Sequence, residues 1–201
     1  MHIEFLVEEQ SAEVALQNLL PRMTGNAATY RIHPFQGKPD LLAKLPQRLR
    51  GYASWMPADW RIVVLVDQDR DNCVELKQRL ERTAAEAGLT TKSTAAARNQ
   101  RLHVINRIAV EELESWYFGD TRALVEAYPG VPTTLDRKAP YRDPDGIRGG
   151  TWEALERVLQ RAGYYPGGLL KIEAARVISR HMAPEPAQRG RRERRRITFR
   201  W

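Results

Sequence analysis

Acidic side chains follow an apolar segment of this chain at a spacing suited to chemistry. Residues 61–66, RIVVLV, run directly into Asp67, Asp69 and Asp71, with an acid at every second position. Glu8 follows the apolar stretch IEFLV in the same way. A turn needs only one acid, so three carboxylates after one apolar run call for a reason of their own.

A bound cation is the best explanation for such a cluster. Carboxylates that share a small volume repel each other and raise one another's pKa values unless a positive charge lies between them. Asp67 and Asp69 point the same way, roughly 6.6 Å apart along the chain, if strand geometry persists through them. Carboxylate oxygens suit hard divalent ions, so we expect Mg²⁺ or Mn²⁺. The alternative is that Asp69 or Asp71 caps the following helix, and capping is the favoured interpretation for Asp71.

The elements that would hold these acids alternate between strand and helix. Strand patterns occur at residues 3–8, 28–35, 61–66 and 102–106. A segment with helical spacing of apolar residues follows each strand. The four segments begin after Ser11, cover residues 40–50 with Pro46 inside, run from Cys73 to Gly88, and start in VEELESWYF. The order predicts an α/β protein with a doubly wound, mainly parallel four-stranded sheet and helices on both faces.

The position of the acids matters in such a sheet. The run 61–66 has no polar alternation, which is typical of a central strand covered on both faces. Ligands bind beyond the carboxyl ends of the strands in open α/β sheets, where the loops diverge. Glu8 and Asp67 each end a predicted buried strand, and neither is placed for a helix cap. If the two strands are neighbours, their carboxylates converge and favour a metal site.

The chain divides into three parts by composition. Residues 1–120 form the predicted metal-binding core. Residues 121–185 begin with a stretch dense in Pro, Gly and charge, 128–150, which favours a functional loop or a mobile flap. Helical patterns at 151–162 and 168–182 then predict a small C-terminal helical appendage. Residues 186–201 are an Arg-rich tail.

The tail carries most of the net charge. The chain has a formal charge of +7, and its last 13 residues, RGRRERRRITFRW, hold seven Arg and one Glu, or +6, which leaves +1 for the rest. Arginine makes fork-shaped contacts with phosphate, so nucleic-acid binding is expected from Arg191, Arg192, Arg194, Arg195 and Arg196. A solvated, unfolded end is the equal alternative.

Composition also excludes some classes. With 201 residues and 42% hydrophobic content, the chain can bury a proper core. Its longest apolar run is far short of the roughly 20 residues that span a bilayer, and it lacks a signal-peptide pattern, so we expect no membrane association. The single cysteine, Cys73, cannot form a disulfide within the chain, which fits the reducing cytoplasm.

The stretch EELESW, residues 111–116, adds further acids. Glu112 and Glu114 lie too close in sequence to share a helix face. If a helix begins near Glu111, one of these carboxylates can face the sheet edge while the other stays in water. The alternative is an ordinary acidic first turn with core contacts from Leu113, Trp116 and Tyr117.

Two stretches together resemble the Toprim superfamily, in which a glutamate ends the first strand and an Asp-x-Asp pair ends the third. These stretches are FLVEEQSAEVALQNLLPRM and VVLVDQDRD. Within that superfamily, NRIAVEELESWYFGD is similar to the signature of an uncharacterised Toprim-like family often encoded beside an AAA-type ATPase and related to OLD-type nucleases. The resemblance covers roughly residues 3–120, with a weaker echo near LLKIEAARVI. Glu9 departs from it, because glycine often follows the Toprim glutamate.

The resemblance implies a metal-dependent enzyme that acts on nucleic acid. Glu8 matches the Toprim glutamate, and Asp67 and Asp69 match the aspartate pair. Glu112 or Glu114 would complete a second metal position. Two metals about 3.5 to 4 Å apart can activate water and stabilise a leaving oxygen in phosphodiester cleavage. Lys171 can neutralise charge in the transition state, although a surface lysine is the alternative.

Three classes of function remain open at this point. The first is a divalent-metal-dependent nuclease, a hydrolase of DNA or RNA, as the effector of an ATPase-coupled defence complex. The second is a non-catalytic Toprim-derived scaffold that binds nucleic acid or an ATPase. The third is a nucleotide-sugar transferase, whose metal motif is also an apolar strand ending in Asp-x-Asp, although such an enzyme does not need Glu8. A receiver domain also joins acids after the first strand to an aspartate after the third. It ranks lower, because the spacing in this chain is long and the helical appendage would be unexplained.

Overall fold

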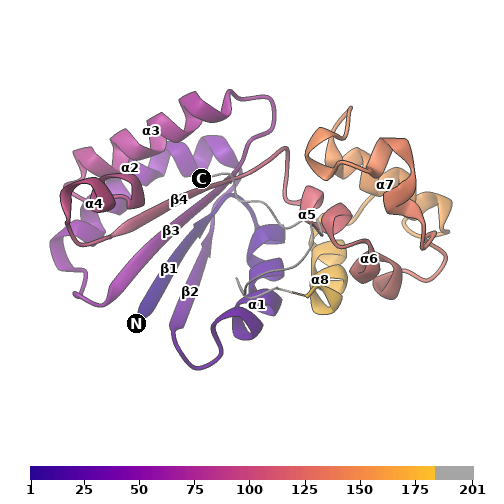
Figure 1. Ribbon diagram of the computed structural model, residues 1–201, viewed down its shortest axis with the longest axis horizontal. Coiled ribbons are helices and arrows are strands. Elements are labelled where there is room, and N and C mark those ends of the chain that lie inside the picture. Colours follow the sequence, from indigo (N-terminus) through magenta and orange to yellow (C-terminus); the bar gives the residue numbers. More distant parts are fainter. Residues whose placement is uncertain (184–201) are drawn as a thin grey trace.

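The sheet of this protein has four strands, all parallel. A computed structural model describes residues 1–183, and Figure 1 shows their arrangement. The strands are β1 (His2–Val7), β2 (Thr29–Pro34), β3 (Trp60–Asp67) and β4 (Val104–Ala109), in the spatial order β2-β1-β3-β4. The predicted doubly wound α/β fold is confirmed. Strands β1 and β3 are direct neighbours, which is the condition for their carboxyl ends to share a rim.

Helices cover both faces of the sheet. Helix α1 (Gln10–Thr24) lies on one face, and α2 (Lys38–Trp55) and α3 (Cys73–Glu86) lie on the other (Figure 1). The α2 helix continues through Pro46 and runs beyond the predicted end at residue 50. A short helix, α4 (Lys92–Arg98), was not predicted. It packs beside β4.

The core has two layers because the central strands are buried on both sides. On the α2 face, Leu41 and Leu45 pack with Val64, Leu76 and Leu80. On the α1 face, side chains of α1 and β1 pack with residues from the C-terminal helices, among them Leu16, Val7, Trp116, Leu155 and Ile178. The unalternated apolar run in β3 supplies both layers, as expected of a central strand in a parallel sheet.

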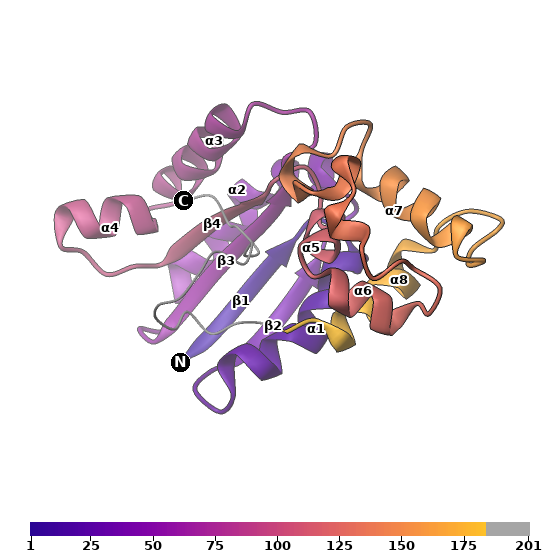
Figure 2. The same cartoon turned by 45° about the vertical axis from the view of Figure 1, so that its right-hand side comes forward.

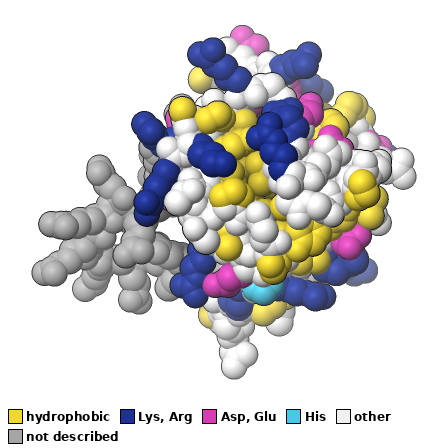
Figure 3. All heavy atoms as spheres, turned by 90° about the vertical axis from the view of Figure 1, so that its right-hand side faces the viewer, with side chains coloured by type: hydrophobic (Ala, Val, Ile, Leu, Met, Phe, Trp, Pro, Cys, Tyr) yellow, Lys and Arg dark blue, Asp and Glu magenta, His cyan; other side chains and the backbone are white. Residues whose placement is uncertain are grey.

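The C-terminal part is helical, as predicted. It comprises α5 (Glu114–Gly119), α6 (Thr121–Ala127), α7 (Thr151–Arg161) and α8 (Lys171–His181), with the 3-10 turns η1 (Leu135–Arg137), η2 (Ala139–Tyr141) and η3 (Pro144–Gly146) between α6 and α7. Helix α8 packs against α1 and α6, which ties the appendage to the sheet layer. The outer surface of the appendage presents apolar side chains with Lys and Arg side chains spread among them (Figure 3).

The Pro- and Gly-rich stretch at 128–150 is packed against the protein. Val131, Leu135, Tyr141 and Ile147 are buried in the same core cluster as α1, and the Tyr141 ring stacks on Phe118 with centroids 5.3 Å apart. The stretch is therefore anchored along its length by buried side chains, which an extended free flap would lack.

The Arg-rich tail and the expected lack of a membrane span are the remaining predictions about the chain. The five tail arginines, Arg191, Arg192, Arg194, Arg195 and Arg196, lie outside the described residues. Within residues 1–183, none of the helices combines the length and the apolar composition that crossing a bilayer requires.

Candidate functional site

Acidic residues line the edge of the sheet where the strands end. The arrowheads of the strands point towards α5 and the helical appendage (Figure 2). Glu8 and Glu9 follow β1, Asp67 ends β3, and the loop after β4 carries Glu111 and Glu112. We call this edge, with Asp69, Asp71 and Glu114, the acidic rim. Parallel strands place all their carboxyl ends at one edge, so residues far apart in the sequence meet there.

Glu8 and Asp67 are held directly against each other. The Asp67 backbone N–H donates to Glu8 Oε2 at 3.0 Å, so the two side chains belong to one small volume. Burial, chiefly, raises the pKa of Asp67 well above its usual value, and the charges of Glu8, Glu114 and Asp69 raise it further. The pKa of Glu8 is also raised by burial and by Asp69, although the hydrogen bond from Asp67 opposes the shift. Burial is the larger cause for both groups, and the neighbouring charges add the repulsion expected of carboxylates that lack a cation.

Asp69 does not continue the strand. Strand β3 ends at Asp67, and Asp69 adopts a left-handed conformation with φ of 49°. Its backbone N–H donates to the Glu111 carbonyl at 2.8 Å. The strand geometry assumed to run through Asp69 therefore ends at Asp67, because the chain turns there and Asp69 bonds the loop after β4.

Lys38 is a cation of the rim that was not predicted from the sequence. Its side chain is buried, with Nζ 2.7 Å from Asp69 Oδ2 and 2.9 Å from Asp71 Oδ2. It also donates to the Gln68 carbonyl at 3.0 Å. Burial opposes the charge of Lys38, but its two aspartate partners outweigh that effect and raise its pKa. Lys38 is the first residue of α2, after Gly37 with φ of 88°. A lysine at a junction between strand and helix was the available signal.

The expected cap on α3 was wrong. Neither Asp69 nor Asp71 caps this helix; the Asn72 side chain does, by accepting from the N–H groups of Val74 and Glu75. Asp71 is one residue too early for that role and turns to Lys38 instead.

Glu112 has a structural partner that lies far along the chain. Its Oε2 accepts hydrogen bonds from the Thr151 N–H at 3.0 Å, the Thr151 hydroxyl at 2.8 Å and the Trp152 N–H at 2.9 Å. It therefore caps the N-terminus of α7, where a carboxylate is favoured by the free N–H groups and the helix dipole. The expectation that one carboxylate of this stretch stays in water does not hold for Glu112.

Glu114 is the buried acid of the rim. It is 2% exposed, and its Oε2 has no hydrogen-bond partner among the described residues. Burial raises the pKa of Glu114 to about 7. Tyr117 is buried beside it, and its hydroxyl also lacks a hydrogen-bond partner within residues 1–183. A buried acceptor and a buried donor without partners cost free energy, and functional sites are where such atoms are retained.

Lys171 faces the rim from the appendage. It is the first residue of α8 and is half-buried, with Nζ 5.3 Å from the centroid of the Trp152 ring. Burial opposes its charge, but Glu114, Glu9 and Glu112 outweigh that effect and raise the pKa of Lys171. It is not the free surface lysine that was the alternative.

The rim can thus accommodate a cation at the side chains that lack other partners. Glu8, Asp67 and Glu114 have raised pKa values, and Glu114 has an unpartnered buried oxygen. Asp69 and Glu112 are occupied by Lys38 and by α7. Within residues 1–183, no group of three or more His, Cys, Asp or Glu side chains already surrounds one point as metal ligands do. The chemistry of Glu8, Asp67 and Glu114 as oxygen donors fits a hard divalent ion.

Comparison with known proteins gives one family. The family described as Domain of unknown function (DUF4276) matches residues 7–192, which is most of the chain. No curated protein and no solved structure matches the chain.

Proposed function

Because the chain belongs to the DUF4276 family, whose description assigns no function, we propose one from the site itself: a divalent-metal-dependent nuclease that cleaves phosphodiester bonds. The observation that carries the proposal is the contact between Glu8 and Asp67 at the ends of adjacent strands. Burial, and secondly the neighbouring carboxylates, raise the pKa of both groups, and a bound cation would offset both effects.

Each residue of the rim has a role in the proposal. Glu8, Asp67 and Glu114 would hold Mg²⁺ or Mn²⁺. A bound divalent ion polarises a phosphate oxygen and lowers the pKa of water, which supplies the nucleophile. Lys171, half-buried and facing the carboxylates, is placed to offset negative charge that develops on the phosphate. Lys38 fixes Asp69 and Asp71, so the loop after β3 keeps its shape when substrate arrives.

A second candidate is a non-catalytic scaffold that binds nucleic acid or an ATPase. Specific contacts favour it: three of the acids at the rim are already used structurally, Asp69 and Asp71 by Lys38 and Glu112 by α7. An AAA-type ATPase partner and a role in defence stay proposals from the Toprim resemblance. They apply equally to both candidates.

Cleavage assays distinguish the two candidates. Purified full-length protein is incubated with supercoiled DNA, linear DNA and RNA in the presence of Mg²⁺ or Mn²⁺, and wild type is compared with Asp67→Ala. The matched control is Asp59→Ala, an exposed acid just before the opposite end of the same strand. Metal-dependent cutting that is lost in Asp67→Ala and kept in Asp59→Ala supports the nuclease. Binding of nucleic acid without cutting, equal in all three proteins, contradicts it and favours the scaffold.

A further inference from the structure

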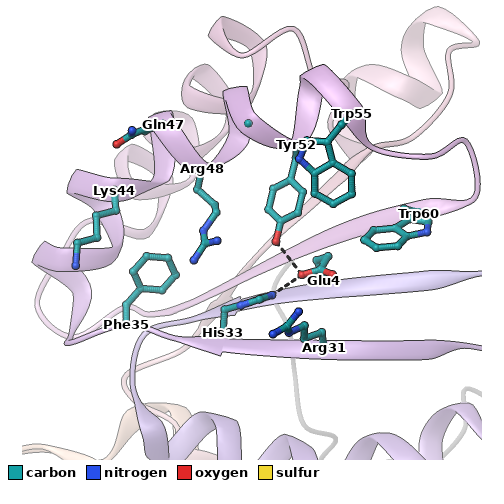
Figure 4. A pocket seen from close by; sticks show the side chains of 11 residues that line it. Glu4, Arg31, His33, Phe35, Lys44, Gln47, Arg48, Tyr52, Trp55 and Trp60 are labelled. Carbon is teal, nitrogen blue, oxygen red and sulfur yellow. Dashed lines mark hydrogen bonds and ion pairs between the residues drawn. The ribbon is translucent and has the colours of Figure 1, made fainter.

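A groove with mixed aromatic and cationic walls lies on the α2 face of the sheet, apart from the acidic rim. Its volume is about 590 Å³. Figure 4 shows the side chains that line it, which come from β1, β2, α2 and the start of β3. Four aromatic side chains border it: Phe35 just after β2, Tyr52 and Trp55 of α2, and Trp60 at the start of β3.

Trp55 is the exposed ring of the aromatic wall. Trp55 is 56% exposed, and its ring lies 5.4 Å from that of Trp60 and 5.5 Å from that of Tyr52, centroid to centroid. A tryptophan left this open adds little to the core, and exposed rings beside a charged groove are the usual platforms for stacking bases.

The floor of the groove is a fixed carboxylate. Glu4 is 4% exposed and accepts hydrogen bonds from the Tyr52 hydroxyl at 2.8 Å, from His2 Nε2 at 2.9 Å and from His33 Nε2. Burial opposes the charge, but these bonds outweigh it and lower the pKa of Glu4. A negative floor of this kind repels phosphate, so an anionic ligand must keep its phosphates at the outer edge of the groove.

Two exposed arginines also line the groove. Arg31 on β2 and Arg48 on α2 are exposed and line the groove from opposite sides (Figure 4). Within residues 1–183, neither makes an ion pair with a carboxylate, whereas Lys44 pairs with Asp40. The charges of both arginines act on the Tyr52 hydroxyl and oppose the rise in its pKa that burial and Glu4 cause, so both guanidinium groups lie within electrostatic range of the groove. These two positive charges disfavour a cationic ligand held by the aromatic rings.

We propose that this groove binds a single-stranded segment of nucleic acid, with bases stacked on Trp55 and Trp60 and phosphates held by Arg31 and Arg48. A strand is favoured over a small nucleotide because the groove is open to solvent at Trp55 and its two arginines are exposed on opposite walls. Small-ligand sites, in contrast, enclose most of their ligand.

The groove also leads towards the acidic rim. Trp60 pairs in register with His2 at the start of β1, and Phe35 donates its N–H to the Val7 carbonyl at the end of β1. The groove therefore spans about five residues of strand, roughly 17 Å, and Val7 directly precedes Glu8. A strand bound along it would reach the rim. This step alone rests on the proposed nuclease function; binding in the groove does not.

Binding is tested without cleavage. A labelled oligothymidylate of about 12 nucleotides, within the range of known single-strand sites, is titrated with full-length protein in EDTA, and fluorescence anisotropy is recorded across a series of salt concentrations. Trp55→Ala is expected to weaken binding by about 5- to 150-fold, while Trp55→Phe, which keeps a ring, stays close to wild type. The double variant Arg31→Ala/Arg48→Ala is expected to reduce the slope of log K against log salt by about 1.4. Arg50→Ala, an exposed arginine of α2 that does not line the groove, is the matched control and leaves the slope unchanged.

Three results would overturn the groove proposal. The first is wild-type affinity in Trp55→Ala together with an unchanged salt slope in the arginine double variant, which would place binding elsewhere on the chain. The second is a thymidine monophosphate that competes as well as the oligonucleotide, which would indicate a small-nucleotide pocket. The third is tighter binding of duplex than of single strand. Failure of the nuclease proposal can be told apart from failure of the groove proposal. If no protein cuts nucleic acid but the groove variants still bind the oligonucleotide more weakly in EDTA, only the nuclease proposal is contradicted.

Discussion

Glu114 should make the stability of this protein depend on pH in a way that one substitution removes. The carboxyl is 2% exposed, and burial raises its pKa from 4.5 to about 7. The native state therefore keeps a proton on Glu114 at pH values where the unfolded chain has lost it. Glu114→Gln replaces the acid with a neutral side chain of nearly the same shape.

The sign and the size follow from proton linkage. Between pH 4.5 and 7 the native state binds more protons at this site than the unfolded state, so the free energy of unfolding falls as pH rises. A shift of this size corresponds to a decrease of about 3 kcal/mol in the free energy of unfolding. The decrease begins near pH 4.5 and is complete by about pH 8. Glu114→Gln should stay within about 1 kcal/mol of wild type at pH 5 and exceed it at pH 8 by up to about 3 kcal/mol. For a chain of this length that is about 6 to 12 °C in Tm.

Urea unfolding at pH 5 and pH 8 in EDTA measures the effect, with the slope m compared to check that the denatured state is unchanged. Glu75→Gln is the control, because Glu75 is an exposed glutamate in the first turn of α3, as Glu114 is a buried one in the first turn of α5. If Glu114→Gln is no more stable than wild type at pH 8, or gains equally at pH 5, the buried acid does not carry the proton assigned to it.

Three further substitutions test the contacts of the rim. Lys38→Met should lower the free energy of unfolding by about 1 to 2 kcal/mol at neutral pH without metal, because it leaves two aspartates without their cation. Added Mn²⁺ should raise the Tm of this variant more than that of wild type, and an equal rise would refute the assignment. Asn72→Ala should cost about 1 kcal/mol in urea unfolding through loss of the α3 cap, and a larger loss in Asp71→Ala would show that the cap is wrongly assigned. Glu112→Ala should cost about 1 to 2 kcal/mol by exposing the N-terminus of α7, whereas Glu112→Gln, which keeps a neutral acceptor, should lose less than half of that in the same assay.

The sheet could be predicted because its signals are local. The unalternated run in β3 identifies a central strand without any knowledge of its neighbours, and the position of Glu8 and Asp67 after apolar strands places them at one edge. The short helix α4 was missed because Lys92–Arg98 has too few apolar residues to form a stripe.

The partners of the acids could not be predicted, because they come from distant segments. Lys38 and Asp71 are 33 residues apart, and Glu112 and Thr151 are 39 apart. No spacing rule connects such residues; only the packing of α2 and α7 at the sheet edge brings them together. The aromatic wall of the groove could not be predicted either. Trp55 and Trp60 have no repeat or spacing in the sequence that distinguishes them from core residues, and only the fold shows that Trp55 is 56% exposed.

The central claim is that the carboxylates of adjacent strands jointly hold a divalent ion. Calorimetric titration of Mn²⁺ into the full-length protein tests it without reference to activity, with Glu8→Gln and Asp67→Asn as variants and Asp59→Asn as the control at the opposite sheet end. We predict saturable binding in wild type and in Asp59→Asn, weakened at least about tenfold in each rim variant, since each removes a charged ligand. Equal binding in all four proteins, or no saturable binding in wild type, would contradict the claim.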